Sequence, residues 1–116
     1  MNIPVYSSFE DMENNISEET APCPVQEETE KMFFLKMPDD SMEPRFTKGT
    51  LVLCRRTQKA KPGSTVIFSV GQNYYLRNMT YDKDFLTFSA ENKAYEDIFF
   101  AGVNLRSAKI KAIVEE

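Results

Sequence analysis

The sequence predicts a mostly β fold. Short runs of β-branched and aromatic residues recur at intervals of about ten residues, and turn-forming residues separate them. No stretch longer than about eight residues has the periodicity of an amphipathic helix. With 116 residues, the chain has the length of one domain with a modest core.

The N-terminal segment differs in composition from the rest of the chain. Residues 1–30 carry eight acidic side chains and no basic one, and prolines stand at positions 4, 22 and 24. Such a segment has little capacity to form a core of its own. We therefore predict a loosely ordered arm over residues 1–31, equivalent to a linker, although its few apolar residues allow it to dock as an edge strand. The folded domain is predicted over residues 32–116.

The β-rich part begins at Met32. Residues 32–37 predict a strand, which Pro38 ends. Residues 41–46 predict a short helical turn, and Lys48-Gly49 a tight turn. Further strands are predicted over residues 50–55, 64–70, 74–79, 85–89, 97–102 and 108–114, with turns at 61–63, 71–73 and 81–84.

The composition excludes several functions. Histidine is absent, which rules out a Ser-His-Asp triad and removes the commonest metal ligand, so we expect neither a metal nor another cofactor. Residues 31–116 carry 14 basic and 10 acidic side chains, but the basic ones are scattered, so we expect no direct contact with nucleic acid. No apolar run approaches the length of a membrane span and the N-terminus has no signal-peptide pattern, which predicts a cytoplasmic location with Cys23 and Cys54 reduced.

A series of motifs carries the functional information. Residues 40–44 read Asp40-Ser41-Met42-Glu43-Pro44, and Gly49 then precedes the apolar run 50–53. The series continues with segments 61–66, 74–78, 89–95 and 110–114. In content and order these segments resemble the C-terminal domain of LexA, lambda-type phage repressors and UmuD over residues 32–116. Signal peptidases share the serine-methionine-proline signature.

The resemblance implies a curled β-sheet of the LexA and signal-peptidase type (β-clip), and a serine peptidase with a Ser/Lys dyad. Ser41 stands at the position of the nucleophile. Asp40, Met42, Pro44 and Gly49 match the residues that shape its loop.

The lysine of the dyad has no counterpart in the aligned strand. Its position is assigned to Leu76, which has no proton-accepting group. Arg77 is expected to point to the opposite face of the strand and cannot serve as a base, because a guanidinium is not deprotonated in proteins. Lys83 and Lys93 lie in polar, turn-like contexts.

Two further departures favour a degenerate site. The chain has no glycine before Gly49, whereas self-cleaving members carry an Ala-Gly or Cys-Gly bond in the arm. Asp39 replaces the usual glycine and places a carboxylate beside Ser41, where it opposes an oxyanion. We therefore expect a pseudoenzyme.

The leading hypothesis is a non-catalytic dimerisation and regulatory domain of a phage- or prophage-type repressor in an SOS-like response. DNA binding would belong to an N-terminal helix-turn-helix, which this sequence does not contain. Expected partners are further copies of the chain and an antirepressor or RecA-like inducer. The interface is predicted to include Phe99, Phe100, Ile110 and Ile113. The alternatives are an active LexA-type autopeptidase and a UmuD-like subunit bound to a polymerase.

Overall fold

The computed structural model describes residues 1–82 and 84–115. Within these residues the chain forms nine strands: β1 (Asn2–Tyr6), β2 (Glu19–Pro22), β3 (Met32–Lys36), β4 (Leu51–Arg56), β5 (Thr65–Val70), β6 (Asn73–Asp82), β7 (Phe85–Ser89), β8 (Ile98–Ala101) and β9 (Ala108–Val114). The helical elements are α1 (Phe9–Asn14) and the 3-10 helices η1 (Thr29–Lys31) and η2 (Gly102–Arg106). None of the described helices has the length and apolar character needed to cross a membrane.

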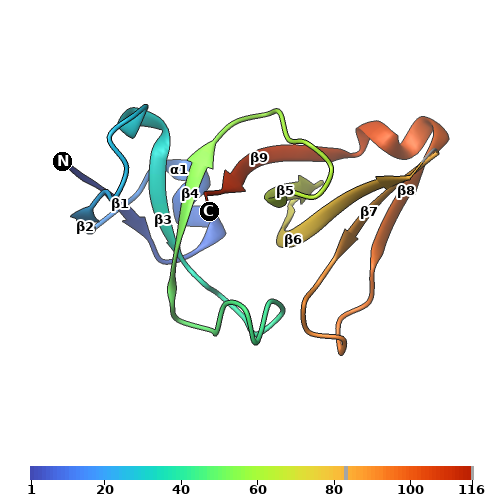
Figure 1. Cartoon of the computed structure of the whole chain (residues 1–116), viewed down its shortest axis with the longest axis horizontal. Coiled ribbons are helices and arrows are strands. Elements are labelled where there is room, and N and C mark those ends of the chain that lie inside the picture. Colours follow the sequence, from blue (N-terminus) through green and yellow to red (C-terminus); the bar gives the residue numbers. More distant parts are fainter. Residues whose placement is uncertain (83, 116) are drawn as a thin grey trace.

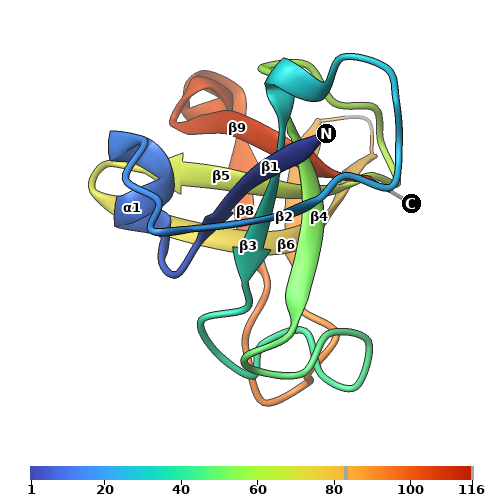
Figure 2. The same cartoon turned by 90° about the vertical axis from the view of Figure 1, so that its left-hand side faces the viewer.

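The described strands form one sheet in the order β2-β1-β3-β4-β9-β5-β6-β7-β8. β1 and β3 run parallel, and the other described pairings are antiparallel. The sheet curls, so that β1–β4 lie at one end of the molecule and β5–β8 at the other, with β9 joining them (Figure 1). In Figure 2, β3 and β4 cross the direction of β5 and β6. The predicted mostly β, curled-sheet fold is confirmed.

Most predicted strands agree with the structure. The strands over residues 85–89 and 108–114 have the predicted bounds, and β3, β4, β5 and β8 differ by one residue at one or both ends. β6 is longer than predicted and takes in part of the expected turn at 81–84; Lys83 of that turn lies outside the described residues. Residues 41–46 form the expected helical turn, in which the Phe46 amide donates to the Met42 carbonyl at 2.9 Å.

The N-terminal segment is packed into the domain, contrary to the prediction of a loosely ordered arm over residues 1–31. β1 pairs with both β2 and β3, and Ile3, Val5 and Tyr6 are buried. In α1, Met12 is completely buried, and the Ser8 hydroxyl caps the helix by accepting from the Asp11 amide at 3.1 Å. The acidic composition suggested a solvated segment, but several of its apolar side chains, those of Ile3, Val5, Tyr6 and Met12, are buried.

Two hydrophobic cores lie on opposite faces of the central strands. The first core includes Ile67 of β5 and Leu76 of β6. The second core includes Val66 and Phe68 of β5 and Met79 of β6. Because side chains alternate along a strand, neighbouring residues of β5 and β6 enter different cores.

Candidate functional site

The candidate site is centred on Ser41, in the loop between β3 and β4. The side chain of Ser41 is completely buried. The Asp39 carboxylate accepts two hydrogen bonds from this residue, one from the Ser41 amide at 3.0 Å and one from the Ser41 hydroxyl at 2.6 Å. The hydroxyl hydrogen therefore points to a carboxylate two residues earlier in the same loop.

Arg77 of β6 contacts the other side of the serine hydroxyl. Its Nη1 donates to Ser41 Oγ at 2.9 Å and to the Leu76 carbonyl at 2.9 Å. Arg77 as a whole is 5% exposed, and its guanidinium carbon lies 5.4 Å from the ring centre of Tyr75 and 5.3 Å from that of Tyr95. These contacts hold a planar cation against the candidate nucleophile.

The electrostatics of Arg77 follow from this burial. Desolvation lowers the pKa of the guanidinium, while the nearby Asp39 carboxylate opposes that shift. Its Nε is buried and makes no hydrogen bond with any described residue. Even so, a guanidinium remains protonated in proteins, so Arg77 donates to Ser41 and accepts nothing from it.

The expected places of Leu76 and Arg77 are reversed in the structure. Leu76 is 1% exposed and packs in the first core, whereas Arg77, expected to face away from the site, contacts Ser41. The expectation that Arg77 points away from the site was wrong, because neighbouring side chains of a strand lie on opposite faces and it is the Arg77 face that meets Ser41. The side chain that faces the serine is arginine, and the conclusion that it is not lysine is unchanged.

The turn before β8 holds the serine loop by three hydrogen bonds. The Asn92 amide donates to the Ser41 carbonyl at 2.9 Å, and Asn92 Nδ2 donates to the Asp40 carbonyl at 3.1 Å. The Tyr95 hydroxyl donates to the Asp40 carboxylate at 2.6 Å, and this bond is the main reason that the pKa of Tyr95 is raised. The sequence drew attention to residues 89–95 as a motif, but gave no indication that they close over Ser41.

A second polar network flanks the site and was not predicted. Arg45 Nη1 donates to the Thr65 hydroxyl at 2.7 Å, and Thr65 donates to Asn78 Oδ1 at 2.8 Å. Asn78 Nδ2 in turn donates to Glu91 at 2.9 Å. The network joins the serine loop, β5, β6 and the turn that follows β7.

The remaining loop residues have structural roles. Met42 is completely buried in the first core. Pro44 follows a cis peptide bond with Glu43. Gly49 has a φ of 90°, a conformation that favours glycine, and its amide donates to the Met37 carbonyl at 2.9 Å.

The predicted interface residues lie around the second core. Phe100 is buried in that core, Ile110 and Ile113 pack partly buried against it, and Phe99 is 62% exposed. Adjacent residues of β8 thus face opposite sides, as the sequence predicted. Their role in an interface stays a prediction.

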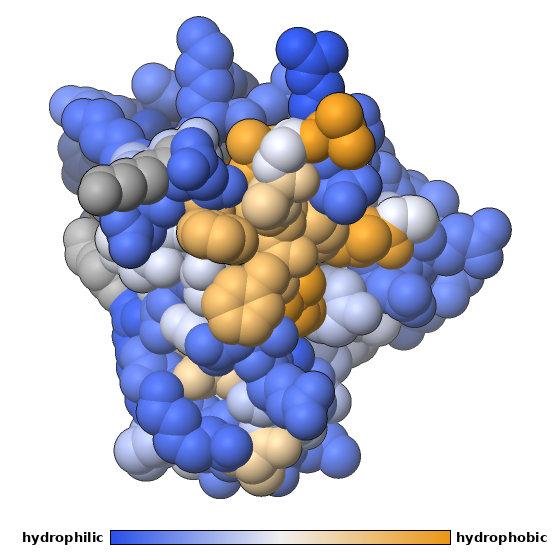
Figure 3. Space-filling model, turned by 90° about the vertical axis from the view of Figure 1, so that its right-hand side faces the viewer, coloured by the Kyte–Doolittle hydropathy of each residue, from blue (hydrophilic) through white to orange (hydrophobic). Residues whose placement is uncertain are grey.

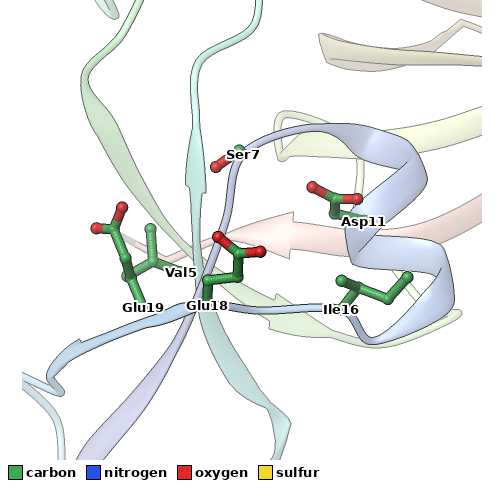
Figure 4. Close-up of a pocket in the computed structure, with 6 residues that line it drawn as sticks. All are labelled: Val5, Ser7, Asp11, Ile16, Glu18 and Glu19. Atoms are coloured by element: carbon green, nitrogen blue, oxygen red, sulfur yellow. The ribbon is translucent and has the colours of Figure 1, made fainter.

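The candidate site differs from the pocket at the N-terminal end of the sheet. That pocket has a volume of about 220 Å³ and lies between β1 and α1. Figure 4 shows the carboxylates of Asp11, Glu18 and Glu19 around it, and none of its lining residues belongs to the Ser41 site. In the described part of the chain, no group of three or more acidic or cysteine side chains is arranged to hold a metal ion.

Fold and site together define a serine-peptidase type of domain, in which a buried serine is held between a carboxylate and a guanidinium. The Peptidase S24-like family model matches residues 3–114, so the chain belongs to that family. The match includes the N-terminal segment that packs as β1, α1 and β2. A search of the curated proteins finds no match to the chain.

Proposed function

We propose that this chain is a non-catalytic dimerisation and regulatory domain of a phage- or prophage-type transcriptional repressor. The observation that carries the proposal is the hydrogen bond from Arg77 to Ser41 Oγ, at 2.9 Å. The group that faces the serine is a donor without acceptor capacity.

The chemistry of a Ser/Lys dyad requires a neutral amine. Burial lowers the pKa of a lysine far enough for it to take the serine proton near neutral pH. The same burial does not turn a guanidinium into a base. Asp39 accepts the hydroxyl hydrogen, but carboxylates are far weaker bases than neutral amines, and its charge opposes an oxyanion at this place.

Access to the serine supports the same proposal. Ser41 is completely buried, and the bonds from Asn92 and Tyr95 tie the 92–95 turn to its loop. Because Ser41 is completely buried, an acyl substrate would reach its hydroxyl only after neighbouring residues move. The chain also lacks a glycine before Gly49, where self-cleaving relatives would carry the scissile bond.

A domain without peptidase activity can still regulate a repressor by holding copies together. Pairing two DNA-binding heads makes the second binding event intramolecular and raises the effective affinity without any new base contact. Induction would then act on the assembly, through an antirepressor or a RecA-like inducer, and not through self-cleavage.

The test is incubation of the purified chain at alkaline pH and separately with a fluorophosphonate probe. Mass spectrometry is expected to show no specific clip and no adduct on Ser41, in the wild type as in a Ser41→Ala control. A clip or adduct that the Ser41→Ala variant lacks would refute the proposal in favour of an active autopeptidase. Co-purification with a polymerase, but not with a repressor, would favour the UmuD-like alternative.

A further inference from the structure

The loop that leads from β4 to β5 forms a small hollow on the surface together with β9 (Figure 1). The hollow has a volume of about 290 Å³ and is lined by Lys59, Ala60, Lys61, Ser64 and Ile113. We call it the loop hollow. Ala60 and Ile113 pack partly buried against the second core, so they give the hollow an apolar base. Its volume lies at the small end of the range for ligand pockets, about 300–1,000 Å³, and suits one large apolar side chain.

Backbone hydrogen bonds hold the loop at both ends. The Thr57 amide donates to the Lys111 carbonyl of β9 at 3.2 Å, and the Gly63 amide donates to the Met79 carbonyl of β6 at 2.7 Å. Within the loop, the Lys59 amide donates to the Thr57 hydroxyl at 3.2 Å. The hollow is therefore largely formed before anything binds, which lowers the entropic cost of binding.

The rim of the loop hollow carries positive charge that the described chain does not neutralise. Lys59 and Lys61 are exposed, and neither forms an ion pair with a described residue. No described acidic residue lines the hollow. A further hollow, also lined by this loop and β9, adds Lys109 and Lys111, of which Lys111 pairs with Glu13 at 3.4 Å. A basic rim around an apolar base is complementary to a ligand that is both acidic and apolar.

The loop hollow differs from the β8 end of the molecule. Phe99 and Val103 are exposed at that end, where Figure 3 shows a hydrophobic area. The apolar residues of the loop hollow are instead partly buried, and lysines surround them. Of the residues predicted to form an interface between copies of the chain, Ile113 lines the hollow, so a second copy is a rival occupant.

We propose that the loop hollow binds an acidic segment of a partner protein, in which one large apolar side chain is flanked by carboxylates. The apolar side chain enters the hollow against Ala60 and Ile113, and the carboxylates meet Lys59 and Lys61 at the rim. The inference rests on the proposed function, because an inducer that acts on the assembly, and not through self-cleavage, needs a docking surface on this domain. Nucleic acid is a poorer match, since its phosphates would contact the lysines and leave the apolar base uncovered.

The first test measures binding of the fluorescein-labelled peptide Gly-Glu-Glu-Phe-Glu-Glu-Gly by fluorescence anisotropy. The wild type is expected to bind it saturably and more weakly as salt is added. Lys59→Glu/Lys61→Glu should raise the dissociation constant by about tenfold or more, because repulsion replaces attraction at the rim. Lys48→Glu/Lys93→Glu is the matched control: both lysines are exposed and lie outside the hollow, and the change in net charge is the same. Its constant should change less than about threefold. Circular dichroism checks that both variants fold.

The second test varies the peptide and leaves the protein unchanged. Serine in place of the phenylalanine removes the group that fills the hollow, and glutamine in place of the glutamates removes the charges that meet the lysines. Each change should weaken binding by about tenfold or more. A duplex oligonucleotide should not displace the phenylalanine peptide at equal concentration.

Several outcomes overturn the loop hollow as a binding site. They are no binding at about 1 mM protein, equal binding of the serine or glutamine peptide, equal losses in the two double variants, and displacement by the oligonucleotide. Dissociation of a dimer of the chain by the peptide, seen in analytical ultracentrifugation, also overturns it, because a second copy is then the occupant.

These outcomes leave the proposed function standing, since that is judged by cleavage and by an adduct on Ser41. Conversely, an adduct on Ser41 in a chain that binds the peptide as expected refutes the proposed function and leaves the peptide site in place.

Discussion

The two hydrophobic cores of the domain differ in how far the described chain encloses them. The first contains twelve buried residues, and only three partly buried apolar residues pack against it. The second contains five buried residues, with nine partly buried apolar residues around them. Fully buried residues thus outnumber partly buried ones in the first core, and the opposite holds in the second, although the same central strands contribute to both.

The two ends of the molecule therefore differ in how well their apolar side chains are enclosed. The closed first core lies under the Ser41 loop and includes Met42, Leu76 and the N-terminal residues Tyr6 and Met12. Its burial supplies most of the hydrophobic stabilisation. The second core ends at β8, where Phe100 is buried in it, and most of the apolar residues around this core are only partly buried.

The largest effect is expected for the reactivity of the two thiols. Cys54 is completely buried in the first core, and this burial, aided by the Glu115 charge, raises the pKa of its thiol. Cys23 is partly exposed. Maleimide should label Cys23 directly and Cys54 only through opening of the core, which for a free energy of about 5 kcal/mol protects it by about 10³-fold or more.

Mass spectrometry over a time course measures this protection, and Cys23→Ser isolates the signal of Cys54. Similar labelling rates for the two thiols would show that the first core opens readily, which contradicts the contrast drawn between the cores.

Replacing one aromatic residue at each end of the molecule by alanine should give losses of stability that differ greatly in size. Phe33 is 1% exposed in the first core. Phe33→Ala should lower the free energy of unfolding by about 3–5 kcal/mol, because the missing ring leaves a cavity. Phe99→Ala should cost less than about 0.5 kcal/mol in the monomer, since its ring packs against little. Urea denaturation at low protein concentration measures both losses. Equal losses of unfolding free energy would contradict the contrast between the enclosed first core and the exposed Phe99.

Much of the fold could be predicted from sequence because local patterns specify it. The runs 85–89 and 108–114 are bounded by turn residues, and the structure gives β7 and β9 those bounds. The N-terminal segment was missed because its acidic side chains dominate the composition. Its burial depends on pairing with β3, whose position relative to β1 is not encoded locally.

The site could be predicted only in part, for a related reason. The serine loop could be predicted from residues 40–44, and the absence of a histidine partner from the composition. The choice between Leu76 and Arg77 depends on strand register, and an error of one residue inverts it. The contacts of Asn92 and Tyr95 join residues about 50 positions apart, which no local pattern specifies.

Arg77 lies where the two regions meet, and its replacement by lysine tests the site itself. On β6 it shares a face with Tyr75 and Met79, while its neighbour Leu76 enters the first core. Arg77→Lys keeps the charge but loses part of the hydrogen bonding to Ser41 and the Leu76 carbonyl, at a cost of about 1–2 kcal/mol. The buried amine can release a proton, so slow fluorophosphonate labelling of Ser41 should appear at alkaline pH.

The double variant Arg77→Lys/Ser41→Ala is the control for this labelling. If the single variant stays unlabelled while it remains folded, then the burial of Ser41, and not the missing amine alone, blocks the chemistry.

The smallest effect is expected from Tyr95→Phe, which removes the bond that ties the Ser41 loop to the segment leading into β8. Because the hydrogen bond to Asp40 raises the pKa of Tyr95 above that of an unfolded tyrosine, about 10, the folded state favours the protonated phenol. The corresponding stability is complete below pH 10 and is lost as the pH rises through the folded pKa. Wild type should therefore lose more stability above pH 10 than Tyr95→Phe, whereas Tyr81→Phe, at an exposed tyrosine, should follow the wild type.

Chemical denaturation at a series of pH values measures the stability of the three proteins. Parallel curves for wild type and Tyr95→Phe would show that the Tyr95–Asp40 bond does not hold the Ser41 loop against the segment that leads into β8.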